Sequence, residues 1–219
     1  MPRKVIIGDY DTAAHGWTLS GYRLDPPMWR ESYISIPGMD GLLDASTALT
    51  GEPQYDNRAL EITLERSDGT RAEREAIITA ILAKLDGRSV RITPPDRTDH
   101  VLIGRVHVAR QYNDLAHAQV TVTASCAPWH YKSALTVVTR DDLGTAYKQL
   151  ALPNEHRPVI PTITVAQDTT LLWGGSTIAM SAGTHRRADI RLQGGANILK
   201  AKVASGTGSI TVEYQEASL

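Results

Sequence analysis

The sequence predicts a mainly β protein with one α-helix, divided into two domains. Polar and apolar residues alternate at period two over most of the 219 residues, as expected for strands with one buried face. One segment, Arg71–Asp86, has an apolar period of 3.6 residues instead. From Val159 onward, short strand-like runs are separated by glycine-rich turns every eight to twelve residues or so, which is typical of a small antiparallel sandwich or jelly roll.

The N-terminal half contains several strand-like runs bounded by glycine, proline or aspartate. The first four are Lys4–Ile7, Trp17–Leu24, Ser32–Ile36 and Leu60–Arg66. Two later runs form a predicted β-hairpin over 101–124, whose inward-facing side chains are Leu102, Val106, Val108, Val120 and Val122. Tyr112–Leu115 is predicted to be the tight turn of this hairpin. A two-residue turn would pair His107 with Val120, and His117 with Arg110.

The single predicted helix covers 71–86. Thr70 and Glu73 form a capping-box pattern at its start, and Gly87 supplies a stop after its end. The apolar stripe consists of Ile77, Ile78, Ile81, Leu82 and Leu85. We expect this stripe to pack on a sheet, because an isolated helix of this length is marginal in water. The opposite face is expected to be solvated and carries Arg71, Glu73, Arg74, Glu75 and Lys84.

The strand rhythm breaks between Ala127 and Pro158, which predicts a linker region with one strand near Leu135–Thr139. The predicted domains are therefore residues 1–132 and 133–219. The second domain is predicted to contain strands at Ile160–Val165, Thr170–Trp173, Ser176–Met180, Arg187–Leu192, Asn197–Val203 and Ser209–Tyr214.

Charge and composition exclude several classes of protein. The 23 basic and 24 acidic residues give a net charge of −1, and the balance is −2 before Ala134 and +1 from there on. Neither half has the basic surface that phosphate-driven nucleic-acid binding needs. No apolar run is long enough for a membrane span, and no secretory signal is expected. Cys126 is the only cysteine and is expected to be a buried thiol in a protein that folds in a reducing cytoplasm.

No residue pattern supports catalysis, so the chain is predicted not to be an enzyme and to need no metal or cofactor. The seven histidines lack metal-ligand spacing, and no nucleophile, Walker or dinucleotide motif is present. Asp40 and Asp44 resemble a glycosidase carboxylate pair, but their glycine-rich surroundings favour a turn. Trp129 and Tyr131 leave two interpretations open, a sugar-stacking platform or the packing of a domain junction. Trp173 has the same ambiguity.

Several short motifs follow one another along the chain. They are the turn motif of Ile36–Asp44, the segment Gly51–Arg58 before a strand, Leu85–Ile92 after the helix, Leu102–Val106, Ala124–Tyr131, Asn154–Val165, Leu192–Asn197 and Ser209–Tyr214. In these motifs and their order, the chain resembles the distal tail protein (Dit) family of long-tailed siphophages over most of its length. One departure is Glu155, which stands where the family commonly has glycine.

This resemblance implies an N-terminal β-sandwich plus α-helix that assembles a hexameric ring, followed by a galectin-like C-terminal domain. The ring would join the tail tube to the tape-measure and the tail-tip hub or receptor-binding proteins. It would leave a channel through which DNA passes without specific binding. The protein would be assembled in the host cytoplasm and reside in the virion tail. No room remains for an inserted sugar-binding module.

Two turn-rich segments, 37–44 and 51–57, are the predicted ring contacts, because few large apolar residues are expected in them and they suit a contact made by loops and sheet edges. The residues proposed for this interface are Pro37, Gly38, Asp40, Gly41, Asp44, Gly51, Tyr55 and Asn57. Pro128, Trp129 and Tyr131 are proposed for the domain junction. The outer face of the helix is an alternative ring contact. The alternative function is a carbohydrate-binding module protein, and a hydrolase ranks third.

Overall fold

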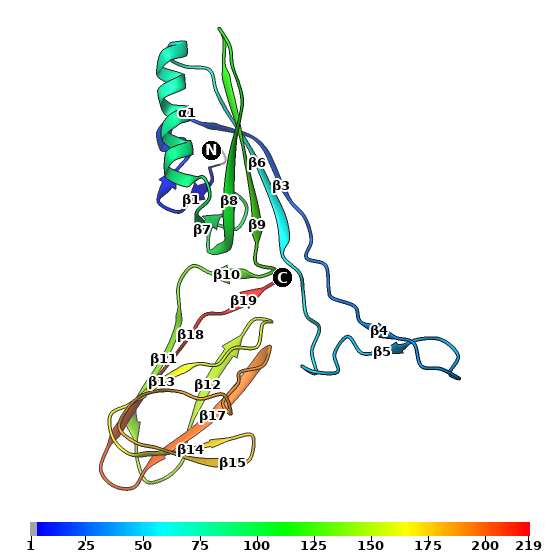
Figure 1. Cartoon of the computed structure of the whole chain (residues 1–219). Helices are drawn as coiled ribbons and strands as arrows, with labels where there is room; N and C mark the ends of the chain where they lie inside the picture. Colours follow the sequence, from blue (N-terminus) through cyan, green and yellow to red (C-terminus); the bar gives the residue numbers. More distant parts are fainter. Residues whose placement is uncertain (1–3) are drawn as a thin grey trace. The chain divides into compact units, whose positions relative to one another are not determined.

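The computed structural model describes residues 4–219 and divides them into two compact units (Figure 1). Unit 1 ends at Pro128, and unit 2 runs from Trp129 to Leu219. Both are built of curled antiparallel sheets, and the described chain contains a single α-helix. This confirms the predicted fold class. Among residues 4–219, no helix has the length and apolar character needed to cross a membrane.

Unit 1 is one antiparallel sheet with a helix against one face. Its elements are β1 (Ile6–Ile7), β2 (Tyr10–Asp11), a 3-10 turn at Ala13–His15, β3 (Thr18–Leu24), β4 (Tyr33–Ile34), β5 (Leu43–Asp44), β6 (Arg58–Arg66), α1 (Arg71–Leu85), β7 (Ser89–Thr93), β8 (His100–Asn113) and β9 (Ala118–Cys126). The main sheet has the order β2-β1-β7-β8-β9-β6-β3, and β4 and β5 form a separate pair. Figure 1 shows α1 running alongside β8.

The core of unit 1 lies between the helix and the sheet. Alternation along the central strands buries one face, on which Leu60, Ile62, Leu64, Val106, Val108, Val120 and Val122 are at most 2% exposed. The helix contributes Ile78, Ile81 and Leu85 to the same cluster. The inward-facing residues predicted for the 101–124 hairpin are therefore confirmed.

The register of the β8–β9 hairpin differs from the prediction. His107 lies opposite Thr123, and Arg110 lies opposite Val120, with an irregularity between Arg110 and Tyr112. The predicted two-residue turn is wrong because Asp114 organises a longer one. Its amide donates to the carbonyl of His117 at 3.0 Å, and its carboxylate accepts from two further backbone amides of the turn.

Helix α1 begins at Arg71, as predicted, and ends at Leu85, one residue before the predicted end. The Thr70 hydroxyl accepts from the Glu73 amide at 3.3 Å, and the Glu73 carboxylate accepts from the Thr70 amide at 2.7 Å. After the helix, Gly87 has φ +73°, a left-handed conformation that suits glycine. Local hydrogen bonding therefore determines both ends.

The prediction that Arg74 is solvated is wrong. This side chain is only 2% exposed. Its guanidinium donates to the carbonyls of Gly69, Asp114 and Leu115 at 2.7, 2.8 and 3.2 Å, and to Asn113 Oδ1 at 3.3 Å. Arg74 thus ties the first turn of the helix to the β8–β9 turn, which the helical periodicity alone does not reveal.

Loss of the helix cap gives a first testable prediction. We expect Thr70→Ala to destabilise unit 1 by about 1 kcal/mol, because the first helical turn loses its side-chain acceptor. Thermal unfolding followed by circular dichroism measures the effect. Thr79→Ala is the matched control, since Thr79 lies mid-helix, where alanine is the better helix former. Equal losses of melting temperature in the two variants would contradict the role of the cap.

Unit 2 is a sandwich of two antiparallel sheets. Its strands are β10 (His130–Lys132), β11 (Thr136–Leu143), β12 (Lys148–Asn154), β13 (Thr162–Val165), β14 (Thr169–Trp173), β15 (Ser176–Met180), β16 (Gly183–Arg186), β17 (Gly195–Val203), β18 (Gly208–Tyr214) and β19 (Ala217–Ser218). The four-stranded sheets have the orders β11-β18-β13-β16 and β12-β17-β14-β15, and their inner faces share one apolar cluster. Strand β10 pairs with β19.

Two sequence predictions in this unit are wrong. The expected linker contains the strands β10 and β12 in addition to β11. Strand β12 forms because Leu150 and Leu152 point into the core and Pro153 is tolerated on an edge strand. The run 187–192 is largely a turn, stabilised by an ion pair between Arg187 and Asp189 at 2.7 Å. The strand there is β16, which lies just before it.

Candidate assembly interface

Residues 25–57 form an arm that leaves unit 1 between β3 and β6 (Figure 1). Its two limbs run antiparallel and are joined by backbone hydrogen bonds. The Arg30 amide donates to the Gln54 carbonyl at 2.7 Å, and the Asp56 amide donates to the Met28 carbonyl at 2.7 Å. Further out, β4 pairs with β5. The arm therefore has a defined backbone without a core of its own, since no residue in 26–57 is buried.

The arm exposes many large apolar side chains. They are Met28, Trp29, Tyr33, Ile34, Ile36, Met39, Leu42, Leu43 and Leu49, each between 39% and 101% exposed. The expectation of few large apolar residues in this region is therefore wrong. A dense set of exposed apolar side chains marks a surface that binds a partner. Neither period-two nor 3.6-residue patterning reveals it, because no residue of the arm from 26 to 57 is buried in a core.

The predicted interface residues fall on this one arm. Pro37, Gly38, Asp40, Gly41 and Asp44 lie in or beside the β4–β5 connection, and Gly51, Tyr55 and Asn57 lie on the returning limb. Tyr55 forms an isolated bridge with Trp29 on the outgoing limb. Asn57 stands at the base of the arm, where its Nδ2 donates to Ser125 Oγ at 3.2 Å. Folding thus brings together two segments that the sequence only suggested separately.

The carboxylates of this region serve the backbone. The Asp44 carboxylate accepts from the Ser46 amide at 2.9 Å, and the hydrogen bonds of Ser46 lower the pKa of Asp44. Gly38 and Gly41 have φ near +80°, as the turn around Asp40 requires. This arrangement supports a turn role for Asp40 and Asp44.

The remaining candidates for chemistry have structural partners. His107 Nδ1 lies 2.8 Å from Asp86 Oδ1. The pKa of Asp86 is lowered mainly by the hydrogen bond from the Val108 amide, and secondly by the hydrogen bond with His107. Cys126 is buried, and its burial raises its thiol pKa to about 11, which keeps it protonated and unreactive at neutral pH. Within residues 4–219, no three histidine, cysteine, aspartate or glutamate side chains gather as they would around a metal ion.

Two of the residues predicted for the domain junction, Pro128 and Tyr131, have contacts within their own unit. In unit 1, the carbonyl of Pro128 accepts from Arg58 Nη1 at 3.1 Å. In unit 2, the Tyr131 ring lies beneath the guanidinium of Arg157, 5.4 Å from the ring centroid. Trp129 and Tyr131 are half-buried. A junction role for Pro128, Trp129 and Tyr131 stays a prediction.

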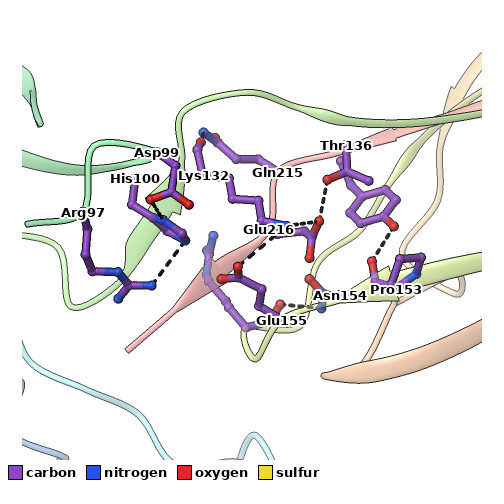
Figure 2. Close-up of polar contacts among 12 residues, drawn as sticks. Arg97, Asp99, His100, Lys132, Thr136, Pro153, Asn154, Glu155, Gln215 and Glu216 are labelled. Atoms are coloured by element: carbon purple, nitrogen blue, oxygen red, sulfur yellow. Dashed lines mark hydrogen bonds and ion pairs between the residues drawn. The ribbon is translucent and has the colours of Figure 1, made fainter.

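Two polar clusters appear in Figure 2, one in each unit. In unit 2, the buried Glu216 carboxylate accepts from Lys132 Nζ at 2.7 Å and from the Thr136 hydroxyl. The hydrogen bond to Glu216 raises the pKa of Lys132, and the ion pair holds the end of the chain against β10 and β11. In unit 1, His100 Nδ1 lies 2.9 Å from Asp99 Oδ1. We interpret both clusters as structural.

Comparison with known proteins places the fold. No family model matches the sequence, and no curated protein matches it. The fold, with two β-rich units and one helix, is similar to that of a phage tail hub protein. Among solved structures, the chain is similar to the SPP1 Dit protein, described as a paradigm of the hub adsorption apparatus in phages that infect Gram-positive bacteria. The TM-score is 0.69 at 19% identity, over 99% of each chain.

A second solved structure, the baseplate of phage p2 in its activated conformation with Sr, gives a TM-score of 0.40 at 7% identity. It covers 94% of this chain and 92% of the p2 chain. The similarity to SPP1 Dit extends over both units, so the described residues share the fold of SPP1 Dit.

Proposed function

We propose that this chain is a distal tail hub protein, a structural component of a phage tail that acts through contact surfaces. The observation that carries the proposal is the exposed apolar arm of residues 25–57 on a chain whose two units both adopt the Dit fold. Exposing so much apolar surface to water is unfavourable in free energy, and burial of the arm against a partner removes this exposure.

The partner of the arm is a second copy of the same chain. The arm is a protrusion, and a protrusion cannot pack symmetrically on itself as easily as into a different surface of a neighbour. Such a head-to-tail contact closes into a ring when its rotation permits. Strand β3 supports this geometry, because it is an edge of the main sheet and leads directly into the arm. By its resemblance to the Dit family, the ring contains six copies.

The ring would join the tail tube and tape-measure protein on one side to the tail-tip hub or receptor-binding proteins on the other. DNA would pass through its channel without being held. The near-neutral charge of the chain agrees with this role, because phosphate affinity depends on clustered basic residues. The work of the protein is then mechanical, and it involves no enzymatic step.

Electron microscopy of the purified full-length chain tests the proposal. We expect closed rings of six copies, formed by the chain alone or after addition of the tail tube protein from the same phage. Immunogold labelling of intact particles should place the chain at the distal end of the tail. Particles that lack the chain, or tails that assemble normally without it, would contradict a hub role.

A further inference from the structure

We propose that unit 2 carries a binding site for a neutral, hydroxyl-rich glycan on the outer face of its β11-β18-β13-β16 sheet. The site consists of a small hollow that holds an unpaired arginine and an unpaired glutamate, continued by a row of four threonines. This site stands independently of the tail role, because every residue in it belongs to unit 2.

The hollow has a volume of about 240 Å³ and lies at one end of the sheet face. Thr162 is at its centre, paired with Arg186 on one side and with Glu213 on the other. Directly paired residues share a face of a sheet, so all three side chains point outward together. Val159 and Ile160 contribute apolar lining.

Arg186 and Glu213 are available to a ligand. Neither side chain has a hydrogen bond or an ion pair with any described residue, although most other charged side chains of unit 2 are paired. A guanidinium offers only donors and a carboxylate only acceptors. A sugar ring satisfies both, since each hydroxyl both donates and accepts, while its C–H face can rest on Val159 and Ile160.

Three charged side chains line the hollow, and they are the guanidiniums of Arg157 and Arg186 and the carboxylate of Glu213. The Arg157 guanidinium lies over the Tyr131 ring, 5.4 Å from its centroid. Of the two unpaired groups, Glu213 repels an anion and Arg186 repels a cation. A zwitterion could satisfy both groups, but it would not use the surface beside them. That surface carries hydroxyl groups in a regular array, which extends the site in one direction.

The array is a row of threonines beside the hollow. On each strand, the threonine is two positions from the residue that lies level with Thr162. Thr139, Thr211, Thr164 and Thr184 lie side by side on consecutive strands of the sheet. Their hydroxyls are paired at 3.3 Å between Thr139 and Thr211, and at 2.9 Å between Thr164 and Thr184. Neighbouring strands are about 4.8 Å apart, comparable with one pyranose ring. An unbranched oligosaccharide can therefore lie across the strands, with one sugar in the hollow and the next ones along the row.

Binding of neutral oligosaccharides to the full-length chain tests this proposal. The probes are cello-, chito- and malto-hexaose, measured by saturation-transfer NMR and calorimetry. We expect saturable binding of at least one of them. Arg186→Ala and Glu213→Gln should each weaken it about tenfold or more, because the first removes charged donors and the second replaces a charged acceptor with a weaker neutral one. Lys200→Ala on the other sheet and Glu61→Gln in unit 1 are the matched controls, and each should change the affinity less than about twofold.

Thr164→Val separates the row from the hollow. It should weaken the hexasaccharide more than the disaccharide of the same sugar, because only the longer probe reaches the row. All variants are surface substitutions, and circular dichroism checks that they fold. The proposal is overturned if none of the three hexasaccharides saturates, if Arg186→Ala and Glu213→Gln bind as the controls do, or if only charged probes bind and salt abolishes their binding.

Discussion

Replacing both Leu42 and Leu43 with asparagine is expected to abolish ring assembly while leaving the chain folded. These side chains are 59% and 44% exposed on the arm, so their loss costs the isolated chain little. In a ring, each copy would bury them against its neighbour, and each buried leucine contributes about 1.5–3 kcal/mol. The loss is repeated at every contact. Electron microscopy and size-exclusion chromatography measure the loss of rings, and phage complementation measures the loss of infectious particles.

The matched control is Leu115→Asn at the tip of the β8–β9 hairpin. Leu115 is 91% exposed and lies outside the arm. We expect rings and infectious particles to form normally with this variant. If the arm variant assembled as well as this control, the arm would not be the contact between copies. If it failed to fold, single leucine variants with intact circular dichroism spectra would take its place in the same assay.

Arg74→Ala is expected to lower the stability of unit 1 by about 3 kcal/mol, the largest effect of any single substitution considered. Removal of the guanidinium leaves three partly buried backbone carbonyls and the buried Asn113 Oδ1 without their donor. Each unsatisfied buried group costs about 1–3 kcal/mol, reduced where water can enter. Urea titration with a thiol reagent reports the effect, because the only cysteine, Cys126, is buried in this unit.

Arg71→Ala provides the comparison for this measurement. Arg71 lies three residues earlier on the same helix and is exposed, so its replacement should change stability by less than about 0.5 kcal/mol. Arg74→Lys should fall between the two, because an ammonium cannot reach all the acceptors that the guanidinium bridges. Cys126 reacting at the same urea concentration in Arg74→Ala and Arg71→Ala would show that Arg74 does not hold the helix to the hairpin.

These two predictions separate the two kinds of contact in the molecule. Arg74 acts within one chain and holds α1 to the β8–β9 turn. Leu42 and Leu43 act between chains and contribute nothing to the fold of the isolated molecule. A substitution that abolishes assembly but leaves the unfolding midpoint unchanged therefore identifies a contact between chains.

The sequence by itself determined the elements that depend on local hydrogen bonding and periodicity. The helix was predicted within one residue, because Thr70, Glu73 and Gly87 act on backbone groups a few positions away. The inward faces of β8 and β9 were predicted because side chains of a strand alternate strictly. The candidate contact segments 37–44 and 51–57 were also recognisable, as turns rich in glycine, proline and aspartate.

Only the tertiary structure decided which of these elements meet. The register of β8 against β9 follows from the turn built on Asp114, and the burial of Arg74 follows from carbonyls that arrive from 40 residues away along the chain. The two contact segments became one arm because backbone groups of residues 28–30 pair with those of 54–56. Such pairings join positions far apart in the sequence, and local patterns carry no information about which distant partner a strand or a side chain will find.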